Sequence, residues 1–245
     1  LLISVAGWGL ELRKSSLGLI ATFLVAICPA LFQLRTDYVL EMPLTATVTF
    51  TIWRLGCWLN PNHGGNWWQA LLAALGATSA LLVKQSSLLV LLPAFVWASI
   101  ISIRRKKTTR WQLVAGLALV ISGILPWLRH NWITTLGGTN RAVIESAAIE
   151  GDPQLLSLDN WIWYPRLLPE QVGSVMLGIG LSGWLLWILT KKSLSVGSSN
   201  KTTAFHEIFA WRWLIITLVS GWLLTSISPN KDSRYIAPLL PPLLL

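Results

Sequence analysis

The stretch LGLIATFLVAICPALFQLRTDYVLEMPLTATVTF, residues 17–50, decides the fold class of this chain. It opens with an apolar run long enough to cross a hydrocarbon core of ~30 Å as a helix. It then passes through the charged turn RTDYVLE and enters a second apolar run. The alternation of apolar and polar residues that a half-buried strand requires is absent from it. The stretch therefore predicts two membrane-spanning helices joined by a short polar turn.

The same pattern continues along the whole sequence. Of the 245 residues, 53% are hydrophobic and only 12% are charged, about half the charged share of a soluble domain. Apolar blocks of about 17 to 20 residues, each bounded by charge, proline or tryptophan, predict an all-α polytopic bundle of about nine transmembrane helices. The expected spans are 1–12, 17–33, 43–60, 67–83, 86–103, 112–128, 171–190, 210–228 and 235–245.

Both ends of the sequence lie inside apolar runs, and the first residue is Leu1 rather than methionine. We therefore expect one transmembrane domain, residues 1–245, that is a piece of a longer protein, with its first and last spans truncated. Cys28 and Cys57 fall inside expected spans, so the sequence predicts no disulfide framework.

Basic residues gather on one face if the spans alternate in direction. They occur at Arg13 and Lys14, in RRKKTTR (104–110), and at Lys191 and Lys192. The positive-inside bias makes this face cytoplasmic, and eight of the ten acidic residues fall on the opposite face. The formal charge of +9 is therefore explained by topology, and we expect no nucleic-acid partner.

The outer face has three short polar turns and one long connection. The turns are residues 35–44, the neighbourhood of Lys84, and residues 228–241, and the extracytoplasmic connection covers about 129–170. A charged side chain costs ~2.5 to 3.5 kcal/mol at mid-bilayer, so ionisable residues near spans usually face protein or water. We expect the long connection to form a partial lid over a cavity at this face.

Two charged residues on these turns have competing interpretations. Lys84 has apolar residues on both sides and no acidic neighbour within ten residues. It could snorkel to the interface or bind an anion such as phosphate as a point charge. Glu41 precedes Met42 and Pro43, so it could meet the positive end of a helix dipole, or hold an acceptor hydroxyl or a divalent ion.

Four segments carry a resemblance to a known family. They are RTDYVLEMPLTATVTF (35–50), GATSALLVKQSSLLVLLPAF (76–95), ILPWLRHNWI (124–133) and KDSRYIAPLLPPLLL (231–245). Their order resembles that of bacterial GT-C type membrane glycosyltransferases, in particular the family of dolichyl-phosphate-mannose protein mannosyltransferases and lipid A aminoarabinose transferases. No segment is specific by itself, but the similarity extends over nearly the whole chain.

The resemblance implies a polyprenyl-phosphate-linked sugar as donor and a hydroxyl on a glycan, lipid or protein as acceptor. It places the reaction on the outward face of a bacterial plasma membrane. Lys84 and Arg234 would contact the lipid phosphate, with Arg129 a weaker candidate and Tyr235 orienting Arg234 or the head group. Glu41 would position the acceptor or help hold a divalent cation. Arg35 and Asp37 are secondary candidates.

The sequence also departs from the family pattern. The principal catalytic acid of the family lies in the first outer loop, which would precede Leu1, and nothing in this chain matches it. Glu41 stands where aspartate is more frequent, and Gln85 where glycine is common. Two other functions remain open. One is a transporter or flippase of a lipid-linked or anionic substrate, because buried cations also mark substrate pathways, and the other is a structural subunit.

Overall fold

The computed structural model describes residues 1–12, 15–60, 65–190 and 201–245, and within these ranges the chain forms helices and no strand. The α-helices are α1 (Leu2–Leu12), α2 (Ser15–Ile27), α3 (Pro29–Thr36), α4 (Glu41–Leu59), α5 (Trp67–Val83), α6 (Ser87–Ile103), α7 (Lys107–Asn140), α8 (Ser146–Glu150), α9 (Leu158–Leu168), α10 (Ser174–Thr190), α11 (Lys201–Ile227) and α12 (Leu240–Leu243). Two π-helical segments, η1 (Arg141–Glu145) and η2 (Pro169–Gly173), and one 3-10 segment, η4 (Ser233–Leu239), complete the chain. The expected all-α fold is confirmed. The basic pairs Arg13–Lys14 and Lys191–Lys192 lie outside the described ranges.

A break at Cys28 divides the second expected span into α2 and α3. Cys28 has a non-helical ψ of 120°, and Pro29 takes the first position of α3. Proline disfavours the helical conformation in the residue before it, and at the first helical position its missing N–H costs nothing. The two helical pieces are consequently bent by 55° relative to each other.

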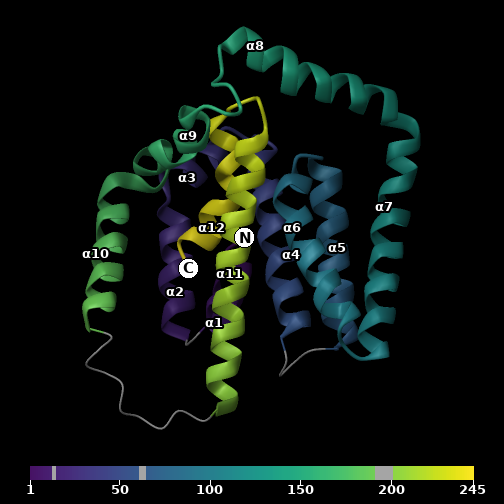
Figure 1. Ribbon diagram of the computed structural model, residues 1–245, viewed down its shortest axis with the longest axis vertical. Helices are drawn as coiled ribbons and strands as arrows, with labels where there is room; N and C mark the ends of the chain where they lie inside the picture. Colours follow the sequence, from purple (N-terminus) through teal and green to yellow (C-terminus); the bar gives the residue numbers. More distant parts are fainter. Residues whose placement is uncertain (13–14, 61–64, 191–200) are drawn as a thin grey trace.

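Two tight turns lie at the same end of the bundle. The first joins α3 to α4 and contains Tyr38, whose φ is +52°. The second joins α5 to α6 at Lys84, whose extended backbone (φ −160°, ψ 128°) ends α5. The turn between α6 and α7 lies at the opposite end, as alternating helices require (Figure 1).

Helix α4 lies at the centre of the bundle. It packs against α1, α5, α6 and η4, while α5 also packs against α7 and α11 against α6. Its side chains Val48, Ile52 and Trp58 are almost fully buried, together with Trp213 of α11. The Trp213 indole N–H donates to the backbone oxygen of Ile52 at 3.0 Å. This bond ties the middle of α4 to α11.

The helices differ in how well they suit a membrane. Two stretches of the described chain are long and apolar enough to cross one: Lys107–Glu150 and Ile208–Ile227, with the bent α2–α3 pair a third if it counts as one span. The helices Leu2–Leu12, Trp67–Val83 and Ser87–Ile103 are apolar but shorter. At 1.5 Å per residue, a 17-residue helix is only about 25 Å long. The expected number of about nine spans therefore exceeds the number that meets this criterion.

The C-terminal segment does not form the span expected at 235–245. It folds as the 3-10 segment η4 and the four-residue helix α12, and Ile236 through Pro242 are all buried. Pro238, Pro241 and Pro242 lack the N–H that an α-helix needs and clash with the preceding turn. This segment fills the interior of the bundle instead of crossing it (Figure 1).

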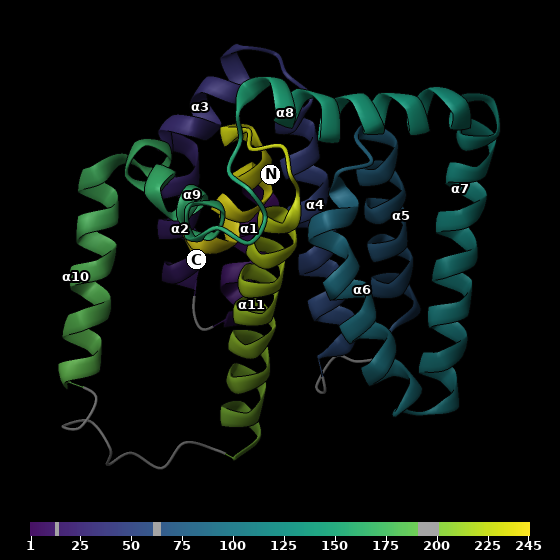
Figure 2. The same cartoon turned by 45° about the horizontal axis from the view of Figure 1, so that its top comes forward.

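The connection expected at about 129–170 is largely helical. Helix α7 continues to Asn140 and runs through η1 into α8, and Gly151 (φ +71°) ends this arm. Figure 2 shows α8 and the adjoining part of α7 crossing one end of the bundle. Helix α9 follows and packs against α11 and η4. The segment is therefore folded, and it lies at the same end of the bundle as the turns at Tyr38 and Lys84 (Figure 1).

Gly9 and Gly18 allow α1 and α2 to approach closely. A Cβ on Gly9 would lie 2.3 Å from the Cα of Gly18, where only backbone movement could relieve the clash. We expect Gly9→Ala to lower the free energy of unfolding by ~1–3 kcal/mol, measured as a lower thermal unfolding midpoint in detergent. Gly178→Ala on α10 is the matched control, because its Cβ would meet no atom within 4 Å. Equal midpoints for Gly9→Ala and the wild type would contradict this account.

Candidate functional site

An ion pair joins the start of α4 to the end of α5. The Nζ of Lys84 lies 2.6 Å from Oε1 of Glu41, and the side chains are 30% and 5% exposed. The two residues are 43 positions apart in sequence, and packing of α4 against α5 brings them together. Glu41 is the first residue of α4, where the helix dipole favours a carboxylate, and the same carboxylate pairs with Lys84.

The turn between α11 and η4 brings three more groups to this pair. The Lys84 Nζ lies 5.1 Å from the ring centroid of Tyr235. Asp232 caps η4 by accepting from the backbone N–H of Arg234 at 2.8 Å. The Nε of Arg234 donates to both Asp232 carboxylate oxygens, at 3.0 and 2.9 Å. Glu41, Lys84, Asp232, Arg234 and Tyr235 are called the outer cluster below.

Charges in the outer cluster are balanced. Burial raises the pKa of Asp232, but the hydrogen bonds and charge of Arg234, helped by Lys84, outweigh burial and hold this pKa below its ordinary value. The hydrogen bond to Asp232 in turn raises the pKa of Arg234. Each cation therefore has an internal carboxylate partner, and an incoming anion must compete with that partner.

A polar cleft of about 340 Å³ adjoins the outer cluster at Arg234. It lies between α3, η2 and η4, and its polar lining residues are Gln33, Asp37, Glu170, Gln171, Ser233 and Arg234. The Gln171 amide donates to the backbone oxygen of Ser233, which fixes one wall. The cleft presents carboxylates, amides and one guanidinium, which suit a substrate rich in hydroxyl groups.

An apolar groove of about 320 Å³ lies on the other side of η4. Its walls are side chains of α9, α11, η4 and α12: Pro165, Leu168, Leu218, Val219, Trp222, Ile236, Leu239, Leu240 and Leu243. Leu240 also lines the polar cleft. The two cavities, one polar and one apolar, therefore share a wall residue and flank the same segment of the chain.

The remaining residues predicted from the sequence are more scattered. Asp37 lines the polar cleft. The Arg35 guanidinium lies over the Phe32 ring, 4.8 Å from its centroid. Arg129 is an exposed residue of α7, and α7 packs mainly against α5, α6 and η1. The structure thus brings Glu41, Lys84, Arg234 and Tyr235 together but gives Arg129 no place beside them.

Sequence reasoning missed a buried junction next to the outer cluster. Lys231 is only 4% exposed, and its Nζ donates to the backbone oxygens of Ser226 and Ser228 at 2.6 and 2.7 Å. Its backbone N–H donates to Oδ2 of Asp152 at 2.8 Å. Lys231 stands in the KDSRY segment that carried the resemblance, which could have directed attention to it. No sequence segment of this kind includes Asp152, so its contact with Lys231 could not be expected.

This junction predicts a pH dependence of stability. Burial lowers the pKa of Lys231 from 10.5 to about 8, and the charge of Asp152 opposes the shift. At pH values between these two pKa values, the unfolded chain binds more protons than the folded chain, so the free energy of unfolding should rise with pH. We expect the wild type to gain up to about 3 kcal/mol relative to Lys231→Met between pH 8 and 10.5, measured by chemical unfolding in detergent. Parallel pH profiles for the two proteins would contradict the prediction.

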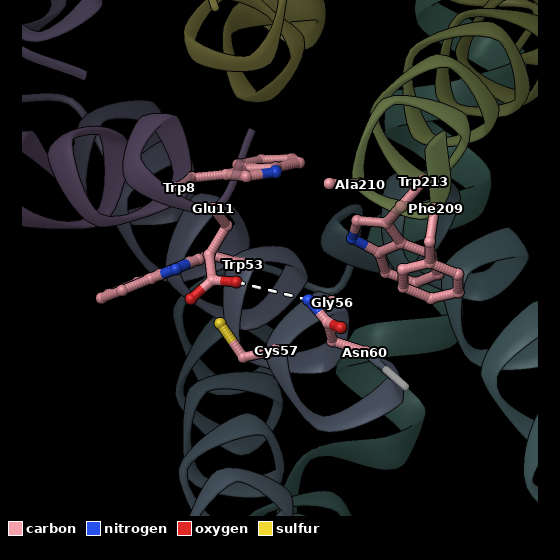
Figure 3. Close-up of a pocket in the computed structure, with 9 residues that line it drawn as sticks. All are labelled: Trp8, Glu11, Trp53, Gly56, Cys57, Asn60, Phe209, Ala210 and Trp213. Carbon is pink, nitrogen blue, oxygen red and sulfur yellow. Dashed lines mark hydrogen bonds between the residues drawn. The ribbon is translucent and has the colours of Figure 1, made fainter. Parts of the chain in front are cut away.

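A third cavity lies toward the other end of α4, between α1, α4 and α11. Figure 3 shows the Glu11 carboxylate directed toward the Asn60 amide, beneath Trp8, with Nδ2 and Oε2 3.4 Å apart. The cavity measures about 10 Å³, room for about one water molecule. It is a packing junction and too small for a substrate.

The described residues also bear on the divalent cation suggested by the sequence. Among residues 1–12, 15–60, 65–190 and 201–245, no group of three or more His, Cys, Asp and Glu side chains could hold a metal ion. The chemistry below therefore uses only the side chains of the chain itself.

Comparison with known proteins now adds to the geometry. Residues 6–130, just over half of the chain, match the family described as Dolichyl-phosphate-mannose-protein mannosyltransferase. The chain belongs to this family. No curated protein and no solved structure matches it. The resemblance drawn from the sequence is thus confirmed, and the protein is an integral-membrane glycosyltransferase. The family match includes Glu41 and Lys84 and ends before Arg234 and Tyr235.

Proposed function

We propose that the protein transfers a sugar from a polyprenyl-phosphate donor to an acceptor hydroxyl at the outer cluster. The observation that carries this proposal is that two cations, Lys84 and Arg234, lie on turns at the same end of the bundle. They are 150 positions apart in the sequence. Two cations beside a polar cleft suit a phosphate, because charged hydrogen bonds to phosphate are strong.

The chemistry requires stabilisation of the phosphate that leaves the sugar. Negative charge develops on this phosphate as the bond to the sugar breaks, and cations held beside it stabilise that charge. Lys84 and Arg234 supply the positive charge. Glu41 is bonded to Lys84 and 5% exposed, so we assign it to positioning that lysine. The base for the acceptor hydroxyl is assigned to none of the five residues.

The two cavities support an amphipathic substrate at this position. The apolar groove would hold part of the prenyl chain against Trp222 and Leu243. The polar cleft would hold sugar hydroxyls near Asp37 and Glu170, because carboxylates accept hydrogen bonds from hydroxyl groups. Arg234 lies in the wall of the cleft, where it would meet the phosphate bonded to the sugar.

The distribution of charge supports an outward-facing reaction. The outer cluster lies at the end of the bundle opposite the turn that contains Arg104 and Arg105 (Figure 1). Basic residues mark cytoplasmic turns, so the outer cluster would face away from the cytoplasm of a bacterial plasma membrane. The acceptor would then be a glycan, lipid or protein of the cell envelope.

The test uses purified protein in liposomes that contain a panel of polyprenyl-phosphate sugars. With a mixture of glycans, lipids and proteins added as hydroxyl acceptors, we expect one donor to be consumed, its sugar to appear on an acceptor, and polyprenyl phosphate to be released. Polyprenyl phosphate alone should raise the thermal unfolding midpoint. The stabilisation should disappear in the Lys84→Gln/Arg234→Gln double variant. Arg141→Gln is the control, because the side chain of this arginine is 83% exposed in η1. Equal stabilisation of wild type and double variant would overturn the proposal.

A further inference from the structure

The hydroxyl of Tyr164 on α9 is buried without a hydrogen-bond partner in the described part of the chain. The whole residue is 0% exposed. A buried polar group that makes no hydrogen bond destabilises the fold, so each case in a folded protein calls for an explanation. A phenylalanine would fill the same space without this penalty. The hydroxyl is therefore a candidate for a contact that forms in another state of the protein.

The groups around Tyr164 belong to the turn that carries the outer cluster. Its ring lies 5.6 Å from the Nζ of Lys231, and Lys231 directly precedes Asp232 in sequence. The bond from the backbone N–H of Lys231 to Asp152 ties the same turn to the segment before α9. Burial raises the pKa of the Tyr164 hydroxyl, and the charges of Tyr235, Asp232 and Asp152 add to this effect. The hydroxyl is thus protonated at neutral pH and can donate a hydrogen bond, and its helix α9 packs against η4, the segment that Asp232 caps.

In this structure the Asp232 carboxylate already accepts hydrogen bonds from another side chain. Arg234 donates to both of its carboxylate oxygens. When a substrate phosphate takes the Arg234 guanidinium, the Asp232 carboxylate keeps only the backbone N–H of Arg234 as a hydrogen-bond donor, while its side chain is 21% exposed. A carboxylate has about four acceptor sites, and leaving most of them unused in such a place costs free energy. A further donor to Asp232 would therefore favour phosphate binding by Arg234.

We propose that Tyr164 is this replacement: when Arg234 moves to the substrate phosphate, the Tyr164 hydroxyl donates a hydrogen bond to Asp232. The proposal rests on the proposed function, because it assumes that Arg234 binds phosphate. Tyr164 is a positioning residue here and does not touch the substrate. The exchange gives Asp232 a side-chain donor in both states, in addition to the backbone N–H of Arg234, and it gives the unpaired hydroxyl of the substrate-free state a role.

Tyr164→Phe isolates the hydroxyl. Because that group makes no bond in the substrate-free state, the variant should unfold at the same temperature as the wild type or higher. Its affinity for polyprenyl phosphate, measured by thermal shift or calorimetry in detergent, should fall about ten- to a hundredfold, the worth of one hydrogen bond to a charged group. Tyr38→Phe is the matched control, because Tyr38 is 94% exposed, and it should bind like the wild type.

Asp232→Asn provides the second arm. The asparagine keeps an oxygen for capping η4 but loses the charge that holds Arg234, so this variant should bind polyprenyl phosphate more tightly than the wild type. In its background, Tyr164→Phe should have no further effect on affinity, because the two residues act as one unit.

The outcomes separate the two proposals. Wild-type affinity in Tyr164→Phe, or the same fold loss with and without Asp232→Asn, would overturn the exchange while leaving phosphate binding by Lys84 and Arg234 intact. Failure of the wild type to bind polyprenyl phosphate at all would overturn both.

Discussion

Lys84→Met is expected to lower the rate of sugar transfer by about 100- to 1000-fold, the loss typical when one preorganised stabiliser of developing negative charge is removed. Methionine keeps the length of the side chain and fits the apolar surroundings of α5 and α6. What it removes is the ammonium group 5.1 Å from the Tyr235 ring and 2.6 Å from Glu41. Single-turnover transfer from a lipid-linked donor measures the effect directly.

Two further variants make this prediction specific. Lys84→Arg keeps the positive charge but spreads it over a planar group, so it should retain more activity than Lys84→Met. Lys107→Met replaces a lysine at the start of α7, at the other end of the bundle, and should transfer at the wild-type rate. Activity of Lys84→Met within tenfold of the wild type would remove Lys84 from the phosphate site.

The sequence could predict features of the fold that depend on local composition. The turns at Lys84 and before Glu41 follow from charges between apolar runs, and both lie at the helix ends where they were expected. The C-terminal segment was predicted wrongly, because hydropathy alone favours a span at 235–245. The backbone limits that Pro238, Pro241 and Pro242 impose decide the outcome there.

The contacts of the candidate site depend on packing between distant segments. Lys84 has no acidic neighbour in sequence, and its partner follows from the position of α4 beside α5. The bond between Lys231 and Asp152 spans 79 positions, and no local pattern indicates it. The sequence could therefore name Glu41, Lys84, Arg234 and Tyr235 as separate candidates. The roles of Asp232 and Tyr164 could be inferred only from the geometry of the turn between α11 and η4.

Glu41→Gln is expected to destabilise the protein by about 2 kcal/mol and also to reduce transfer. Removing one member of a buried ion pair typically costs ~3 to 5 kcal/mol, because the other charge stays behind without compensation. The expected value is smaller here, since the Lys84 side chain is 30% exposed and water can reach it. Chemical unfolding in detergent measures the loss.

The double variant Glu41→Gln/Lys84→Met separates stability from function. It removes both charges, so no unpaired ammonium remains and most of the lost stability should return. Transfer should stay as low as in Lys84→Met alone, because the charge that stabilises the departing phosphate is still missing. Should the double variant unfold as easily as Glu41→Gln, the destabilisation must come from lost packing of the glutamate. Should its transfer recover with its stability, the ion pair serves the fold and the phosphate site must lie elsewhere.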